Sequence, residues 1–464
     1  MLLKWFSDEE FSAAKNYIYS AVAWLVVGVT FAVILAIKFV IPDFLGVNSY
    51  LTFGRVRVAH IQSVALGFLS AGYVASLYYM VPRLTGVRLY SERLGNFLCL
   101  VFNATLGTGV LAVLLGFTEG REYLELPRLW DWLVLAFLVL TAFNVFMTIA
   151  NRRERQIYVS LWYFMGTMVW FPLVWFIGNR TWVKLDGLND AAVNWFYGHN
   201  HLGLWFTTVG VGMVYYLIPI ITRNPLFSHK LSLIGFWSIA MVYAPTGAHH
   251  LLQAPIPEWL KSAAIISSLL LLIPVAASVT NFYMTAKGKW HVVFSNVALR
   301  FTMAGVLYYL ITCLQGPFQA ARPVNFYLHF SNWVVAHAHV ALLGSFGFFT
   351  WGAIYHMLPR ILKVNWFSMS LANWHFWLTF LGFWMFFVVL TISGLIQAAM
   401  WAGGHPWINV VIAQQPMMIA RMLSGFIMLG GQIAFAYNVI RTVLIARRRA
   451  IELPAGIEPE PAHA

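Results

Sequence analysis

The stretch SNWVVAHAHVALLGSFGFFTWGAIYHML, residues 331–358, combines the two features that decide the architecture of this chain. It is apolar and long enough to cross a hydrocarbon core of about 30 Å as a helix that rises 1.5 Å per residue. It also carries His337 and His339 near its start. The stretch therefore predicts a membrane helix that brings imidazole groups into the lipid-embedded part of the protein.

Similar stretches recur along the whole sequence. Apolar residues make up 60% of the 464 residues, charged residues only 10%, and the mean hydropathy is +0.73, whereas soluble domains are about a quarter charged. Lipid cannot hydrogen-bond a bare backbone, so each stretch should be helical. We therefore expect an all-α polytopic membrane protein with twelve transmembrane helices in one bundle. The expected spans are 17–41, 58–82, 94–118, 130–150, 158–178, 193–221, 231–252, 262–286, 298–316, 331–358, 373–399 and 416–443.

The domain organisation that follows is simple. Residues 1–16 form a polar cytoplasmic segment without a cleavable signal, 17–443 form the twelve-helix domain, and 444–464 form a Pro- and Glu-rich cytoplasmic tail that we expect to be disordered. Cys99 and Cys313 lie inside spans and belong to no CxxC or CxxCH pattern. Any covalently bound c-type haem must therefore be on another chain.

The net charge of +13 follows from membrane topology and does not indicate a nucleic-acid partner. Lys and Arg accumulate in the cytoplasmic loops of membrane proteins. Sorted by the twelve spans, 19 of the 29 basic residues are on the side that holds both termini and 10 are on the other. This distribution predicts that both termini are cytoplasmic, which requires an even number of spans.

Six histidines inside the spans share one depth. They are His60, His199, His249, His250, His337 and His339. All should lie near the non-cytoplasmic ends of their spans, in one shallow layer. A single membrane histidine often only hydrogen-bonds a neighbouring helix. Six at a common level indicate a functional interior, because ionisable groups are costly in lipid and imidazole is a favoured ligand of haem iron and copper.

The spacing of these histidines separates two kinds of site. His337 and His339 are two residues apart, about 200° around a helix, so they face opposite sides and can each bind a different haem. His249 and His250 cannot share one face of a regular helix, but at a distorted span end they can converge on one metal together with His199. Three imidazoles with an open position suit a copper ion that binds a small ligand.

Sequence motifs through most of the chain resemble those of the haem–copper oxidase superfamily, specifically the catalytic subunit of the C-family, or cbb3-type, cytochrome c oxidases. The motifs are RVRVAH (55–60), RRERQIYVSLWYF (152–164), NWFYGHNHLG (194–203), YAPTGAHH (243–250), NFYLHFSNWVVAHAH (325–339) and RMLSGF (421–426). The histidine layout is the most specific part of this resemblance.

The resemblance implies a role for each histidine. His60 and His339 would be the axial ligands of a low-spin haem b, and His337 the proximal ligand of a high-spin haem b3. Copper would bind to His199, His249 and His250. Tyr243 matches the redox-active tyrosine that, in this family, is covalently joined to the ligand at the position of His199.

Other matched positions imply supporting roles. Arg57 and Arg421 match arginines that bind haem propionates, although they could also be ordinary basic loop flanks. Tyr215, Ser232 and Tyr309 match polar positions of the family's single proton channel, although membrane hydroxyls often only bond a neighbouring residue.

Two departures from the family pattern bear on proton transfer. Gln315 stands where the family commonly has glutamate, and Asn332 stands where it commonly has aspartate. No Asp or Glu lies deep within any expected span. A carboxylate relay is therefore not expected, which puts proton pumping in question.

The nearest alternative is nitric oxide reduction at a non-haem iron in place of copper. NO reductases share the six-histidine scaffold, but they have a glutamate four residues after the first metal-ligand histidine, where this chain has Gly203. Iron favours such an added carboxylate. Together with Tyr243, this glycine favours an oxidase.

A second alternative, from another class, is a transporter or a non-catalytic haem b electron-transfer subunit. We see no repeat of two symmetric halves, which a transporter would show, and an electron-transfer subunit needs no three-histidine metal site. We therefore expect a terminal respiratory oxidase in a bacterial inner membrane. It would reduce O₂ to water with cytoplasmic protons and with electrons from a c-type cytochrome subunit.

Overall fold

The structure, a computed structural model, describes residues 6–179 and 183–452 and contains helices but no strand in that part of the chain. Eleven helices of this part are long and apolar enough to cross a membrane, and the total is twelve when one bent pair of helices is counted as a single span. Each corresponds to one expected span, so the all-α membrane fold is confirmed. The single-helix spans are α1 (Ser12–Lys38), α4 (Glu92–Leu115), α5 (Arg128–Ala150), α6 (Val159–Gly178), α13 (Val297–Ala320), α17 (Met369–Ala402) and α18 (Trp407–Glu452).

The remaining spans are built from consecutive helical segments. These are α2 (Phe53–Ile61), η3 (Gln62–Leu69) and α3 (Ser70–Thr85); α7 (Gly187–His201), η4 (Leu202–Thr207) and α8 (Thr208–Thr222); α9 (His229–Val242) and η5 (Ala244–Leu251); α10 (Glu258–Leu270) and α11 (Leu272–Ala286); α15 (Asn332–His339), η6 (Val340–Gly347) and α16 (Phe348–Leu362). Three short helices complete the chain: η2 (Ser49–Leu51), α12 (Trp290–Ser295) and α14 (Arg322–Leu328).

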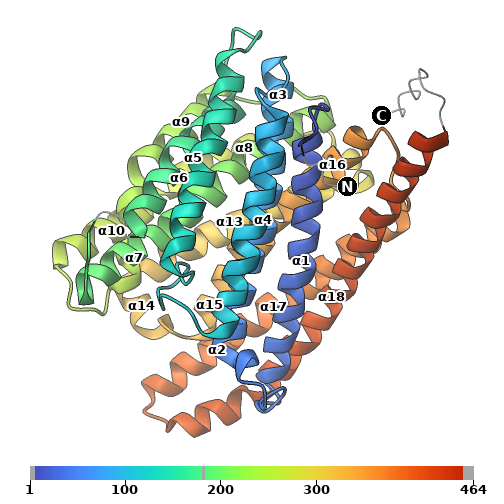
Figure 1. Cartoon of the computed structure of the whole chain (residues 1–464). Helices are drawn as coiled ribbons and strands as arrows, with labels where there is room; N and C mark the ends of the chain where they lie inside the picture. The colour runs from blue at the N-terminus through green and yellow to red at the C-terminus, as the bar shows by residue number, and fades with distance from the viewer. Residues whose placement is uncertain (1–5, 180–182, 453–464) are drawn as a thin grey trace.

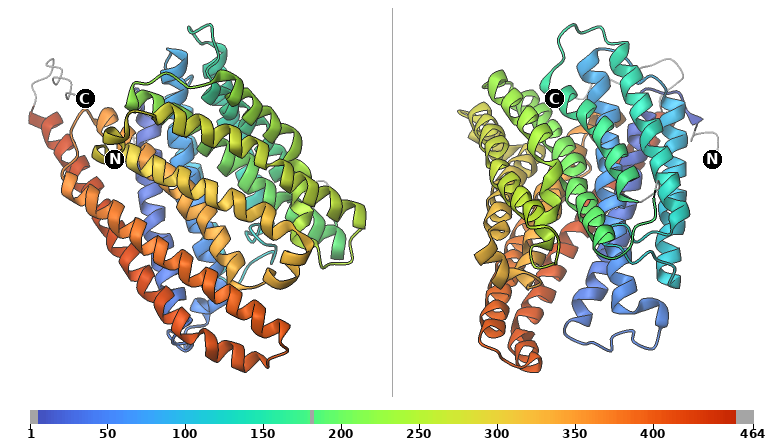
Figure 2. Two further views of the ribbon diagram at one scale, coloured as in Figure 1. Left: turned by 180° about the vertical axis from the view of Figure 1, so that it is seen from behind. Right: turned by 90° about the vertical axis from the view of Figure 1, so that its left-hand side faces the viewer.

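The two ends of the bundle differ in which helix ends and connections they contain. The start of α1 and the end of α18 lie at the same end, and the connection between α17 and α18 reaches the opposite end (Figure 1; Figure 2). This agrees with an even number of spans. Which end faces the cytoplasm stays a prediction. Residues 1–5 of the expected N-terminal segment and 453–464 of the expected tail are outside the described residues, and α18 continues past 443 to Glu452.

The surface of the bundle is apolar and its interior contains many of its polar side chains. Leu111, Ile266 and Leu381 are more than half exposed, whereas Asn200 and Thr208 are fully buried. This is the arrangement expected when the solvent is hydrocarbon, because only the interior offers hydrogen-bond partners.

Three spans change to π-helix directly after a histidine-bearing turn. The π-helical segments are η3, η4 and η6. Segment η3 begins two residues after His60, and η4 and η6 begin directly after His201 and His339. Within or just after each segment, a hydroxyl donates to the carbonyl five residues earlier. These bonds are Ser70 to Ala65 (3.0 Å), Thr207 to Leu202 (2.9 Å) and Ser345 to Val340 (3.0 Å). Such insertions are rare and often mark functional sites.

A second structural element also occurs three times. A serine caps the start of a helix, its backbone N–H donates to an asparagine side chain on another helix, and that asparagine donates back to the serine carbonyl, at 2.8–3.0 Å. The residue before the serine donates to a threonine four residues after the asparagine. The three sets are Tyr90, Ser91, Asn144 and Thr148; Phe227, Ser228, Asn281 and Thr285; Phe367, Ser368, Asn438 and Thr442.

These clamps reveal a threefold repeat that the sequence pattern did not suggest to us. We expected no repeat of two halves, and the recurrence found here is of three parts. His60, Tyr197 and His337 each precede the clamp serine of their unit by 31 residues. Equal lengths of chain between each of these turns and its own clamp bring the turns to similar depths. A shared cofactor layer requires this arrangement.

Candidate metal and haem site

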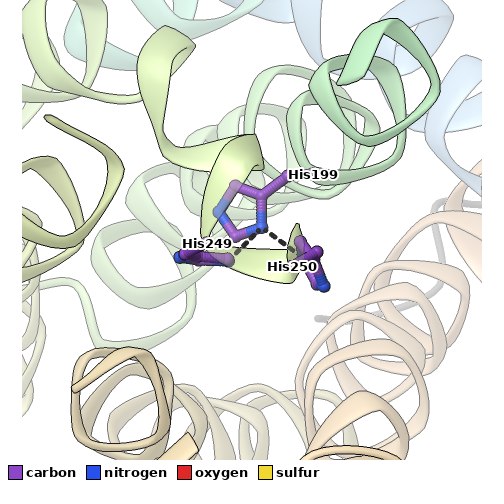
Figure 3. A group of neighbouring side chains, drawn as sticks. All are labelled: His199, His249 and His250. Carbon is purple, nitrogen blue, oxygen red and sulfur yellow. Dashed lines mark hydrogen bonds between the residues drawn. The ribbon is translucent and has the colours of Figure 1, made fainter. Parts of the chain in front are cut away.

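Three histidines from two segments meet in the interior. His199 is on α7, and His249 and His250 are on η5. Nδ1 of His199 lies 3.2 Å from Nε2 of His249 and 3.2 Å from Nε2 of His250 (Figure 3). One nitrogen from each ring lies within 4.8 Å of the others. Three neutral imidazole nitrogens directed at one point form a ligand set for a single metal ion.

The convergence of adjacent histidines depends on the bend at the end of the seventh span. The axis turns by 55° between α9 and η5, and η5 is a 3₁₀ helix. Gly247 permits this segment to lie against α7, because a Cβ there would be 2.4 Å from the carbonyl oxygen of Trp195. Distortion at this span end was expected from the sequence. The close approach that requires the glycine was not.

Tyr243 lies beside the three-histidine cluster. Its ring is stacked at 5.2 Å from the ring of His199, and Nε2 of His199 is buried without a hydrogen-bond partner among the described residues. The tyrosine occupies the space next to Gly203, where an added Cβ would be 1.8 Å from Cε1 of Tyr243. Because no side chain fits at 203 with Tyr243 in place, this position cannot supply a carboxylate ligand.

Two contacts that the sequence did not indicate hold the other histidines. The hydroxyl of Ser268 on α10 lies 2.6 Å from Nδ1 of His249, which leaves Nε2 for the cluster. The indole of Trp195 stacks on His250 with 4.0 Å between ring centroids and 11° between planes. Such neighbours orient metal ligands, and they come from helices remote in sequence.

His60 and His339 form a separate pair, within electrostatic range of one another and of Arg421. Nδ1 of His60 lies 2.9 Å from the carbonyl of Gly28, and Nδ1 of His339 lies 2.8 Å from the carbonyl of Val335. Both rings therefore have Nε2 available for a metal.

Arg421 fits an acidic group that the protein itself does not supply. Its guanidinium lies between the rings of Phe39, at 4.1 Å, and Phe386, at 5.6 Å. The ion pairs found in the described part of the chain do not include it. A half-buried cation is stabilised by a counter-charge, and the propionate of a haem held by the adjacent histidines would provide one.

His337 lies near the three-histidine cluster. It is close enough to contribute electrostatically at His199, His249 and His250. His339, two residues later, lies against the ring of Phe386 and near His60. The two histidines of span ten therefore lie near different groups of residues, as their helical spacing predicts.

Arg57 has a protein partner. Its guanidinium pairs with Glu122 at 2.5 Å in the connection between α4 and α5. Nearby, the amide of Gln62 donates to Glu125 at 2.6 Å. Burial, with the charge of Glu122 as a second cause, raises the pKa of Glu125 to about 7. Sequence reasoning missed both glutamates, because they are in a loop between spans.

The three expected proton-path residues are buried. Two of them, Tyr215 and Tyr309, both lie near Tyr163, whereas Ser232 bonds only within its own helix. Ser232 donates to the carbonyl of His229 on its own helix at 2.7 Å. Tyr215 accepts from the amide of Asn281 at 3.4 Å and stacks on Tyr163. Tyr309 lies near both Tyr163 and Tyr243, and it shares a hydrogen bond with Cys313.

Asn281, Tyr163 and Cys313 are therefore the polar neighbours of Tyr215 and Tyr309 between the clamp at Ser228 and Tyr243. They were not singled out from the sequence as members of a proton path, because isolated polar residues on membrane helices are common.

Together these features define a class of protein. A membrane bundle with a three-imidazole cluster, a fourth histidine near it and a histidine pair beside a half-buried arginine is suited to hold redox metals and porphyrin in one layer.

The chain matches the family described as Cytochrome C and Quinol oxidase polypeptide I over residues 12–427, and it belongs to that family. It is therefore an oxidoreductase of the haem–copper oxidase type.

Several known proteins are similar over most of their length. The chain is 31% identical to a cytochrome c oxidase subunit 1 homolog of Agrobacterium tumefaciens, with 94% of this chain and 84% of that protein covered. It is 29% identical to the Cbb3-type cytochrome c oxidase subunit CcoN1 of Stutzerimonas stutzeri, with 96% and 98% covered. A nitric oxide reductase subunit of the same organism is 25% identical, with 83% and 84% covered.

A solved haem–copper terminal oxidase dimer has the same fold. Its chain superimposes with a TM-score of 0.74 at 12% identity, with 93% of this chain and 83% of that chain covered.

Proposed function

We propose that this chain is the catalytic subunit of a cbb3-type terminal oxidase that reduces O₂ to water. The observation that carries the proposal is the three-histidine cluster with Tyr243 seated against Gly203. In this arrangement His199, His249 and His250 would hold copper, His337 would hold a high-spin haem b3, and His60 with His339 would hold a low-spin haem b. Bound together, these groups supply electrons to O₂ at one place.

The chain's own residues perform the remaining tasks. Tyr243, whose ring lies against Gly203 and beside the copper ligands, supplies a phenolic proton and, when needed, an electron. Protons reach it from the cytoplasmic side along Tyr215, Tyr163 and Tyr309. Arg421 binds a haem propionate, while Arg57, paired with Glu122, supports the same face of the site.

Partners and location follow from the same proposal. The chain has no CxxCH motif, so a c-type cytochrome subunit supplies electrons from the non-cytoplasmic side. The complex is in a bacterial inner membrane, with both termini of this chain in the cytoplasm.

Nitric oxide reduction at non-haem iron is the second candidate, supported by the similarity to a nitric oxide reductase subunit. The close packing at Gly203 argues against it, because the added carboxylate that iron favours has no room. Metal analysis of the purified complex, with O₂ and NO turnover, decides between the two. One copper per two b-type haems with fast O₂ turnover is expected. Iron in excess of haem without copper would refute the oxidase assignment.

Ligand variants test the individual roles. His249→Ala should lower the copper content while both haem signals remain, because the hydrogen-bond neighbours found for His249 in the described structure are His199 and Ser268. His60→Ala or His339→Ala should instead remove the low-spin haem signal. Equal loss of every cofactor in all three variants would indicate misfolding, and loss of haem with copper retained in His249→Ala would contradict its assignment.

Tyr243→Phe tests the catalytic tyrosine. The ring still fills the space beside Gly203, so both haems and copper should bind, but O₂ turnover should fall by at least about 100-fold, the lower range for loss of a proton-transfer group. Near-normal turnover of the phenylalanine variant would remove Tyr243 from the mechanism.

A further inference from the structure

His337 has two hydrogen-bond neighbours on α13, and both are uncharged. Its Nδ1 lies 3.4 Å from Oε1 of Gln315 and 3.5 Å from Oγ1 of Thr312. These residues are three apart, so they lie one above the other on the helix face that meets α15. Neither hydrogen bond found for His337 in the described chain involves an Asp or Glu.

The partner of a ligand histidine affects the metal that the histidine binds. When Nε2 binds iron, Nδ1 carries a proton and must donate it. A carboxylate acceptor draws that proton away and makes the imidazole a stronger electron donor, which favours ferric iron. A neutral acceptor leaves the ligand as an ordinary imidazole, which favours ferrous iron by comparison.

Gln315 differs from the acceptors of the other two haem-facing histidines. His60 and His339 donate to backbone carbonyls at 2.9 and 2.8 Å, which helix geometry fixes. The acceptor for His337 is a side chain from another helix. It alone of the three can be changed by substitution without moving the backbone.

We propose that Gln315 is a positioning residue for His337: its amide oxygen accepts from Nδ1, keeps the ligand a neutral imidazole and raises the reduction potential of the haem that His337 binds. This inference rests on the proposed role of His337 as a haem ligand. The proposed role of the Gln315 side chain is separate from proton transfer.

The role assigns a direction to each substitution. Gln315→Glu keeps the shape of the side chain and offers a carboxylate, so the iron–histidine bond should strengthen. The ferric state should then be favoured at least tenfold, which corresponds to about 59 mV for one electron. Gln315→Leu removes the acceptor, so the same bond should weaken and the potential should rise. Thr312→Val is the matched control, because it removes only the more distant hydroxyl.

The experiment uses the purified complex and two readouts that do not depend on turnover. Resonance Raman spectroscopy of the reduced, ligand-free enzyme gives the iron–histidine stretching frequency, and potentiometric titration gives the midpoint of the high-spin haem. We expect opposite shifts in Gln315→Glu and Gln315→Leu, and wild-type values in Thr312→Val.

Two results would overturn the inference. One is an unchanged frequency and midpoint in Gln315→Leu with full haem content. The other is a shift in Thr312→Val as large as that in Gln315→Leu, since Thr312 would then be the acceptor. Failure of the proposed function is distinguishable, because a wild-type complex without any five-coordinate haem would contradict the role of His337 before the variants are compared.

Discussion

At the scale of single residues, the candidate metal site depends on what glycine leaves open. Gly203 has no side chain, and the ring of Tyr243 fills the place where a Cβ would be. Steric exclusion therefore connects two positions that are 40 residues apart in sequence, and it separates the oxidase assignment from the iron alternative.

Gly203→Ala should displace Tyr243 from His199, because a methyl group would need the space now taken by Cε1 of the ring. The backbone of a π-helical segment in a close-packed interior cannot yield by the required amount. We expect full haem content but O₂ turnover as low as that of Tyr243→Phe. Gly425→Ala, where nothing lies within 4 Å of the added carbon, is the control. Equal activity of both alanine variants would show that Tyr243 is not held by this contact.

Glu125 gives a pH dependence at the same scale. Burial raises its pKa from 4.5 to about 7, so the native state binds this proton more tightly than the unfolded chain does. Its contribution to stability is therefore complete below about pH 4.5 and is lost as the pH rises through 7, by up to about 3 kcal/mol. The Glu125→Gln variant would keep an acceptor for Gln62 without this titration.

The measurement compares wild type with Glu125→Gln by thermal denaturation at pH 5 and pH 8, followed by haem absorbance. The wild type should lose more stability between these two values than the variant does. Identical losses in the two proteins would mean that Glu125 does not carry the proton.

At the scale of helices, each of the three clamps joins the capped start of the helix that follows a histidine-bearing span to a second helix. Each asparagine accepts from and donates to the backbone of one serine in the interior. Its removal leaves a buried donor and acceptor without partners, which costs about 1–3 kcal/mol.

Asn144→Ala and Asn281→Ala form a matched pair, since each variant loses one clamp of the same kind. Only Asn281 also contacts the hydroxyl of Tyr215. Both variants should melt at lower temperature, by similar amounts. Only Asn281→Ala should also slow turnover per haem, with a larger solvent deuterium isotope effect. Slow turnover in both variants would show that the clamp itself, and not the link to Tyr215, controls proton delivery.

At the scale of the whole molecule, the even number of spans places both ends of the described chain on one side (Figure 1). The excess of Lys and Arg on that side predicts that it is cytoplasmic. His405, in the exposed connection between α17 and α18, and Glu154, in the exposed connection between α5 and α6, lie on opposite sides in this topology.

A membrane-impermeant thiol reagent tests the orientation in intact cells. His405→Cys should react from outside, whereas Glu154→Cys should react only after the membrane is broken. Of the native thiols, Cys99 is buried and Cys313 lies within a span, so the background should be low. The reverse pattern would invert the proposed direction of proton uptake.

The sequence by itself determined the solvent and the helical spans, and it predicted a common level for the histidines. Hydrocarbon requires long apolar helices, and the spacing of His337 and His339 fixes opposite faces whatever the neighbours are. The tertiary structure alone decided what lies next to each imidazole: Tyr243 against Gly203, Ser268 at His249, and Gln315 at His337. These contacts join helices that are distant in the chain, and such contacts are set by packing and by the π-helical and 3₁₀ segments, whose local sequences carry no periodic signal that predicts them.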